Sequence, residues 1–125
     1  MRHLESKEQC AVIEWARYYV KWYPCLKWLH SSQSGVKLNA LQGAIAKREG
    51  MIAGIPDLFL PYPSQGYAGL FIEMKRPKSN KNTQKGTLSP AQKECLEYLN
   101  SVGYKALVCY GANEAISAIK EYLGM

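Results

Sequence analysis

The chain lacks the features that would place it in a membrane or around a zinc ion. No apolar run approaches the about 20 residues of a transmembrane helix, and the first residues form no signal-peptide core. It has only two histidines, and its four cysteines lie far apart without a Cys-x-x-Cys pair, which disfavours a zinc site. We therefore expect free, mostly buried thiols in a reducing cytoplasm, with no membrane partner and no organic cofactor.

The length and the charge set broad limits on what the chain is. With 125 residues it is expected to form a single domain, residues 1–125. Its 16 Lys and Arg outnumber 10 Asp and Glu, which gives a net charge of +6. A small basic domain favours polyanions, of which nucleic acid is the commonest, but many basic domains bind none. Charge alone therefore leaves nucleic-acid binding open.

Periodicity and turn signals predict an α/β fold with the order α-(β)-α-β-β-α-β-α. Helices are expected at residues 5–23, 39–49, 89–102 and 112–123, and strands at 57–60, 68–75 and 104–110. The segment 26–30 suits a short strand or a stub, and the polar segment 76–88 is expected to be a mobile loop. The first two long strands suit an antiparallel hairpin, and the helix between the last two suits a parallel crossover. The result is a small mixed sheet flanked by helices.

Two short segments carry the chemistry. Gly54-Ile55-Pro56-Asp57 places a carboxylate at a bend, and Glu73-Met74-Lys75 ends an apolar strand. Strand alternation puts Glu73 and Lys75 on one face, and pairing of the two strands would bring Asp57 to Glu73. Two adjacent carboxylates repel unless a cation lies between them, and oxygen ligands favour Mg²⁺ or Mn²⁺.

The spacing suggests a role for each group in phosphodiester hydrolysis. Asp57, Glu73 and the main-chain carbonyl of Met74 are candidate metal ligands, and Lys75 is placed to orient water or to stabilise developing charge. A lone Glu-x-Lys is a weak signal, because an exposed hairpin often carries such a surface pair. The added Gly-Ile-Pro-Asp segment, the apolar strand and the basic charge favour a nuclease.

Five segments in order give the chain a resemblance over nearly its whole length. They are Glu5-x-x-x-Gln9, Ala53-Gly54-Ile55-Pro56-Asp57, Phe71-Ile72-Glu73-Met74-Lys75-Arg76-Pro77, Leu88-Ser89-Pro90-Ala91-Gln92 and Gly103-Tyr104. Together they resemble the VRR-NUC family of the PD-(D/E)xK nuclease superfamily, in the stand-alone form of phages and prophages. The resemblance implies a restriction-endonuclease-like core and a divalent-metal-dependent DNA endonuclease. For stand-alone members it implies a homodimer that cuts branched DNA such as Holliday junctions, in the bacterial host cell if the chain is phage-encoded.

The resemblance adds two residues to the candidate site. A glutamate of the first helix completes the acidic cluster in this family, and Glu5 matches it best because it stands four residues before Gln9. Glu8 and Glu14 are rivals. Gln92 matches the glutamine of the Ser-Pro-x-Gln helix start, which lies near the metal and the DNA backbone. Read alone, each is an ordinary surface polar residue of a helix.

A basic run lies beside the candidate site. It comprises Lys75, Arg76, Lys78, Lys81 and Lys85, which would neutralise phosphates without reading sequence. The alternative is a solvated loop that lysines keep soluble. Gln33 and Ser34 lie in a turn for which the resemblance suggests a role at the DNA backbone, and Lys47-Arg48 would extend the basic track.

Aromatic residues crowd the first third of the chain. Trp15, Tyr18, Tyr19, Trp22, Tyr23 and Trp28 cover more than one side of a helix, which favours core plus a dimer interface over a base-stacking surface. Two other functions stay open. One is a DNA-binding module without catalysis, and the other is a nuclease for flap, linear or single-stranded DNA.

Overall fold

The fold is built on one mixed sheet. The computed structural model describes residues 2–32, 38–77 and 86–125. Four strands lie in the order β1-β2-β3-β4, with β1 at His30–Ser31, β2 at Leu58–Leu60, β3 at Leu70–Lys75 and β4 at Lys105–Tyr110. β2 is antiparallel to β1 and β3, whereas β3 and β4 are parallel. The predicted hairpin, parallel crossover and element order are confirmed.

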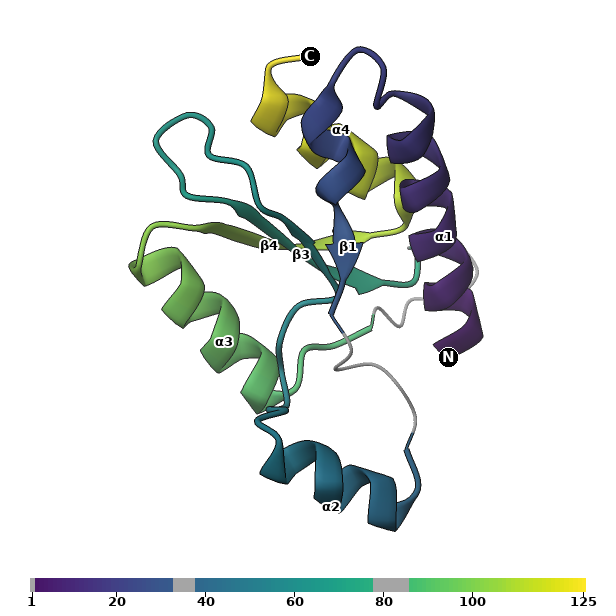
Figure 1. Cartoon of the computed structure of the whole chain (residues 1–125), viewed down its shortest axis with the longest axis vertical. Helices are drawn as coiled ribbons and strands as arrows, with labels where there is room; N and C mark the ends of the chain where they lie inside the picture. The colour runs from purple at the N-terminus through teal and green to yellow at the C-terminus, as the bar shows by residue number, and fades with distance from the viewer. Residues whose placement is uncertain (1, 33–37, 78–85) are drawn as a thin grey trace.

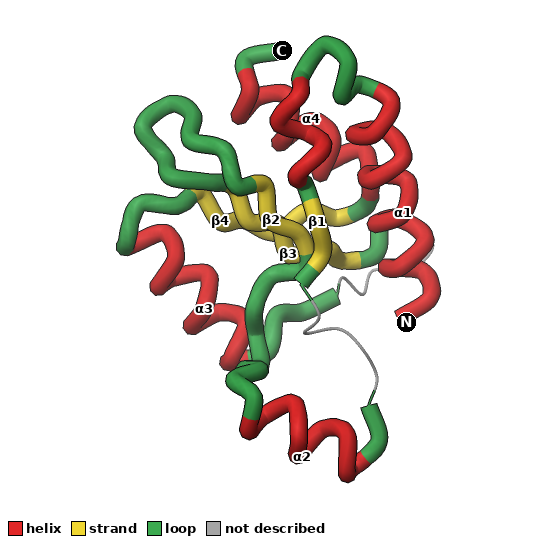
Figure 2. Tube along the Cα trace, in the orientation of Figure 1, coloured by secondary structure: helices red, strands yellow, loops and turns green. Residues whose placement is uncertain are grey.

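Helices cover both faces of this sheet. They are α1 at Arg2–Tyr18, α2 at Ala40–Arg48, α3 at Pro90–Ser101 and α4 at Ala112–Leu123, with a 3₁₀ helix, η1, at Pro24–Trp28. α1 and α4 lie together on one face and α3 lies on the other, with the sheet as the middle layer (Figures 1 and 2). β3 is therefore an inner strand with both faces covered.

Alternation along β3 divides the core in two. Leu70, Ile72 and Met74 are completely buried in the larger cluster, which α1 and α4 cover. Phe71 points to the opposite face and packs with a smaller cluster beneath α3 that includes Leu96 and Leu99. Both predicted faces of the strand are thus present, and the face of Phe71 is the one that continues to Glu73 and Lys75.

The first predicted helix has different ends. Helix 5–23 was expected, but α1 begins at Arg2 and ends at Tyr18. The Tyr19 N–H bonds both to Trp15 O and to Ala16 O, which tightens the last turn before the chain leaves the helix. The segment 26–30 is likewise not a single element. Its first residues belong to η1, which ends at Trp28, and β1 begins at His30.

The helix predicted at 39–49 is confirmed as α2, but its surroundings differ from those expected. Asn39 and Gln42 form a reciprocal capping box at its start. Leu41 and Ile45 were expected to form its apolar side, yet they are 71% and 46% exposed. α2 stands apart from the sheet (Figure 1) and buries none of its residues, so its apolar side has no partner within the described part of this chain.

The expected thiols are free but not mostly buried. Of the four, only Cys109 is buried, and Cys10 is exposed. Cys10 faces solvent because it lies on the side of α1 away from the buried Val12 and Ala16. Among the described helices, none has the length and apolar character needed to cross a bilayer.

Candidate active site

The register of β2 and β3 brings Asp57 to Glu73. Leu58 pairs with Ile72 in the antiparallel ladder, so the next residue along, Asp57, falls opposite Glu73. Asp57 Oδ2 accepts a hydrogen bond from the Met74 N–H at 2.7 Å, which fixes the carboxylate against the end of β3. Both acidic side chains are buried, Asp57 at 9% and Glu73 at 4% exposure. The segment that ends at Asp57 and the segment 73–75 therefore lie side by side, as predicted.

Two glycines shape the approach to this carboxylate pair. Gly54 has φ +93°, and a Cβ there would lie 2.5 Å from Ala91 O at the start of α3. Only glycine therefore lets the bend before Asp57 lie against α3. Gly86 borders the stem of Lys75, whose Cδ would lie 3.0 Å from an added Cβ. The sequence pattern predicted the bend at Gly54 but did not single out Gly86; a glycine beside a polar site is the signal for such close approach.

Gln92 joins Glu73 and Lys75 across the gap between sheet and helix. Its Nε2 donates to Glu73 Oε2 at 3.1 Å, and its Oε1 accepts from Lys75 Nζ at 3.3 Å. The same Oε1 accepts from the Ser89 N–H at 2.9 Å, while Ser89 Oγ accepts from the Gln92 N–H, so the predicted N-cap is a complete capping box. Gln92 is therefore held by the start of α3 while it contacts both site residues.

The carboxyl of Glu73 is strongly perturbed. Burial, then the charge of Asp57 and a hydrogen bond to it, raise the pKa of Glu73 from 4.5 to about 8. The Lys75 ammonium, 3.9 Å from Glu73 Oε2, lowers the pKa, and the charge of Glu5 adds a smaller increase. Burial and the charge of Asp57 thus favour the protonated form of Glu73, and a cation bound between the two carboxylates would favour its ionised form.

The donor set suits a hard divalent cation. Two buried carboxylates meet where their charges repel, and a cation bound by their oxygens would relieve this repulsion. The Met74 carbonyl lies on the same edge of β3 as the Met74 N–H that bonds Asp57. Among the residues that the structure describes, no three His, Cys, Asp or Glu side chains gather closely enough to hold a metal ion. Main-chain, water and phosphate oxygens would complete the coordination.

The structure separates the three glutamates of α1. Glu5 lies near enough for its charge to act on Glu73. Glu8 instead accepts a hydrogen bond from the Ala112 N–H at 2.7 Å, at the start of α4. Glu14 is exposed and lines a groove between α1 and β1. Of the three, Glu5 is the one whose charge reaches the carboxylate pair.

The predicted DNA-binding residues are only partly placed. Lys75 is buried in the site, and half-buried Arg76 follows it along the chain. Lys78, Lys81, Lys85, Gln33 and Ser34 lie outside the described residues. Lys47 and Arg48 are exposed in the last turn of the outlying helix α2.

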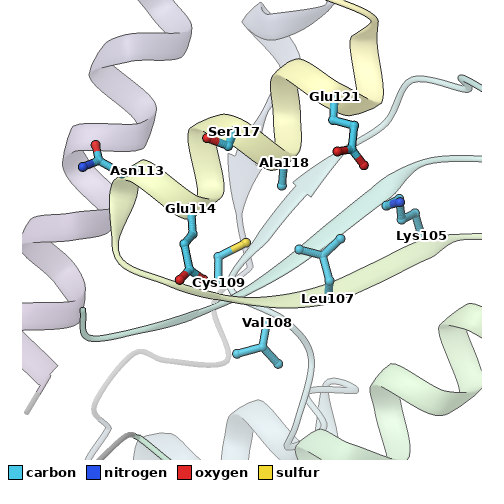
Figure 3. A pocket seen from close by; sticks show the side chains of 9 residues that line it. All are labelled: Lys105, Leu107, Val108, Cys109, Asn113, Glu114, Ser117, Ala118 and Glu121. Carbon is cyan, nitrogen blue, oxygen red and sulfur yellow. The ribbon is translucent and has the colours of Figure 1, made fainter. Parts of the chain in front are cut away.

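Two further surface features are formed by other residues. Trp15, Tyr19 and Tyr23 pack against the core, whereas Tyr18, Trp22 and Trp28 are 69%, 58% and 61% exposed. A pocket of about 500 Å³ lies between the edge strand β4 and α4 (Figure 3). Glu114 and Glu121 project from α4 at this pocket and Lys105 from β4, so its lining carries charges of both signs.

Comparisons with known proteins give one family and one solved structure that match this chain. The VRR-NUC domain family matches residues 4–113 of the chain. A solved structure described as a VRR_NUC domain protein has 30% sequence identity and a TM-score of 0.77, and the match covers 96% of this chain and 88% of that one. A search of curated proteins finds no match. The matched region contains Glu5, Asp57, Glu73, Lys75 and Gln92.

Proposed function

Because the chain belongs to the VRR-NUC family of nuclease domains, we propose that it is a divalent-metal-dependent DNA endonuclease. The observation that carries the proposal is the cluster in which Asp57, Glu73, Lys75 and Gln92 meet at one end of the sheet. Buried carboxylates beside a buried ammonium are costly to a fold and are typical of catalytic sites. A binding module without catalysis would have no use for them.

Each residue of the cluster has a task in this proposal. Asp57 and Glu73, with the Met74 carbonyl, would hold the cation, and Glu5 would add negative charge from α1. Lys75 directs its ammonium toward the reacting phosphate and the attacking water, while Gln92 fixes Lys75 and Glu73 relative to each other. Mg²⁺ or Mn²⁺, when bound, acidifies water and offsets the charge that develops on the phosphate.

We propose further that the substrate is branched DNA and that the protein acts as a homodimer. Tyr18, Trp22 and Trp28 are large exposed aromatic side chains, of the kind enriched in protein interfaces. A two-fold dimer presents two sites, which suits symmetric cleavage of a four-way junction. We propose, too, that the chain is of phage type and acts in the cytoplasm of a bacterial host. Its cysteines, which form no disulfide among the described residues, fit such a reducing compartment.

A cleavage assay tests the catalytic proposal. The protein is incubated with labelled four-way junction, flap, linear duplex and single-stranded DNA, with Mg²⁺ or Mn²⁺. We expect metal-dependent cleavage of the junction, and loss of at least about 100-fold in rate for Asp57→Asn and Lys75→Ala, the range seen when one charge-stabilising group is removed. Glu121→Gln, a carboxylate on the far end of α4, is the matched control and should cleave normally.

Different outcomes separate the alternatives. Junction binding without cleavage by the wild type would support the binding module and sink the enzyme proposal. Preferred cleavage of flap, linear or single-stranded DNA would overturn the junction preference and keep the nuclease. A monomeric mass by light scattering, alone and with the junction, would overturn the dimer.

A further inference from the structure

Glu8 is a half-buried carboxylate whose side chain contacts α4, and the proposed chemistry does not use it. It lies on the same side of α1 as Glu5, one turn further along, and the completely buried Val12 follows it by another turn. Its Oε1 accepts a hydrogen bond of 2.7 Å from the Ala112 N–H, across more than a hundred residues of sequence. This contact joins α1 directly to the first turn of α4.

The start of α4 needs such a partner. Gly111 is the N-cap residue and has no side chain with which to cap the helix. The first N–H groups of a helix have no partner inside it, and the helix dipole favours negative charge at this end. The Glu8 carboxylate supplies both the missing acceptor and the charge, as a charge-assisted bond from another helix.

The same point touches the end of β3. The Gly111 N–H donates to Lys75 O at 2.9 Å, so the residue before Ala112 is bonded to the strand that carries Glu73 and Lys75. Gly111 has φ +91°, and a Cβ there would lie 3.2 Å from Glu8 Oε1 and 3.2 Å from Pro77. α1, the end of β3 and the start of α4 therefore meet at Gly111, where a side chain would be too close to its neighbours.

We propose that Glu8 is a positioning residue, which clamps α1 to the start of α4 and thereby keeps the charge of Glu5 near the metal site. The inference rests on the proposed metal-dependent function. Glu5 precedes the buried part of α1 and lies near the end of this helix, where few other contacts hold a helix in place. Without the clamp, this end of α1 has more freedom, and the negative charge of Glu5 reaches Glu73 less consistently.

Affinity for Mn²⁺, measured by calorimetry on the metal-free protein, reports on the clamp without relying on activity. We expect Glu8→Ala to weaken Mn²⁺ binding by about 10-fold, the lower end of the range seen when a supporting residue outside the ligand set of a metal site is removed. Glu8→Gln keeps an acceptor oxygen and should restore most of the affinity. Val12→Ala on the same helix face is the matched control: it removes core packing, and should lower the thermal unfolding temperature while Mn²⁺ affinity is kept.

A second variant removes the other partner of the same bond. Ala112 is the first residue of α4, where proline is well tolerated, and Ala112→Pro deletes the N–H that Glu8 accepts. We expect it to weaken Mn²⁺ binding as Glu8→Ala does, and the double variant to be no weaker than either, because both changes break one contact. All variants are compared at a temperature at which circular dichroism shows them folded.

The outcomes distinguish this inference from the function it rests on. Unchanged Mn²⁺ affinity in Glu8→Ala and Ala112→Pro, beside normal binding by the wild type, would overturn the clamp alone. An equal loss of affinity in Val12→Ala would also overturn it, because general loosening of α1 would then suffice. Absence of Mn²⁺ binding by the wild type would overturn the metal-dependent function together with the clamp.

Discussion

The two faces of β3 are made from alternate residues of one six-residue strand, yet they are stabilised in different ways. Toward α1 and α4 the strand presents Leu70, Ile72 and Met74, which are buried by apolar packing alone. Toward α3 it begins with Phe71, stacked on Phe59 at 4.2 Å, and then turns polar at Glu73 and Lys75. The polar end is also buried, although slightly less than the apolar face, and Glu73 there contacts both Gln92 and the Lys75 ammonium.

This difference shows how a small domain accommodates buried charge. An unpaired buried carboxylate would cost several kcal/mol, so every group at the polar end has a defined partner. Among the described residues, no buried side-chain nitrogen or oxygen is left without a hydrogen-bond partner. Apolar packing on one face stabilises the strand. This stability keeps the carboxylates of Asp57 and Glu73 close together on the other face, although their proximity is unfavourable without a cation.

Truncation on the apolar face should give the largest effect on folding. Ile72→Ala is expected to lower the free energy of unfolding by about 2–5 kcal/mol, because it leaves a cavity at a fully buried position. Chemical denaturation measures this loss. Mn²⁺ affinity of the folded fraction should stay close to that of the wild type, and a parallel collapse of metal binding would show that the two faces do not act separately.

A matched pair of variants in α3 separates the helix cap from the site contacts. Ser89→Ala removes the N-cap side chain and should cost about 1 kcal/mol of stability, whereas Gln92→Ala keeps that cap and removes only the capping-box bond to the Ser89 N–H. Only Gln92→Ala also removes the contacts to Glu73 and Lys75, and it should lower kcat by about 10-fold further, as loss of a supporting hydrogen bond does at metal sites. Equal kcat values for the two variants would show that Gln92 acts only in capping α3.

A third test, of the polar face, is the pH dependence of the metal-free protein. The pKa of Glu73 is raised to about 8 from 4.5, so the folded state binds an extra proton between these values. Stability from this proton is fully present below pH 4.5 and is lost as the pH rises through about 8. The thermal unfolding temperature should therefore fall more between pH 5 and 9 for the wild type than for Glu73→Gln, whose side chain does not titrate. Added Mn²⁺ should remove the difference at high pH.

Local chemistry predicts part of this molecule well. Ser89 and Pro90 specify the start of α3, and alternation places Glu73 and Lys75 on one face, because caps and strand pleats depend on neighbouring residues. The antiparallel pairing of two adjacent apolar strands likewise brings Asp57 to Glu73.

Tertiary contacts decide the rest. Glu5 and Glu8 occupy one side of the same helix, and the choice between them depends on Gly111, more than a hundred residues away, which leaves α4 without a cap of its own. Helical periodicity correctly predicted α2, but the pattern of Leu41 and Ile45 does not reveal whether that side meets another element.

The site draws on α1, the bend before β2, the end of β3 and the start of α3, four places spread over most of the chain. During synthesis, Asp57 and Glu73 leave the ribosome well before Gln92, and the Gly111 that bonds the end of β3 comes later still. Cleaving power of the proposed kind thus arises only once most of the domain has been made and folded. On the proposed function, a truncated or unfolded chain would lack the assembled site and should not cleave DNA.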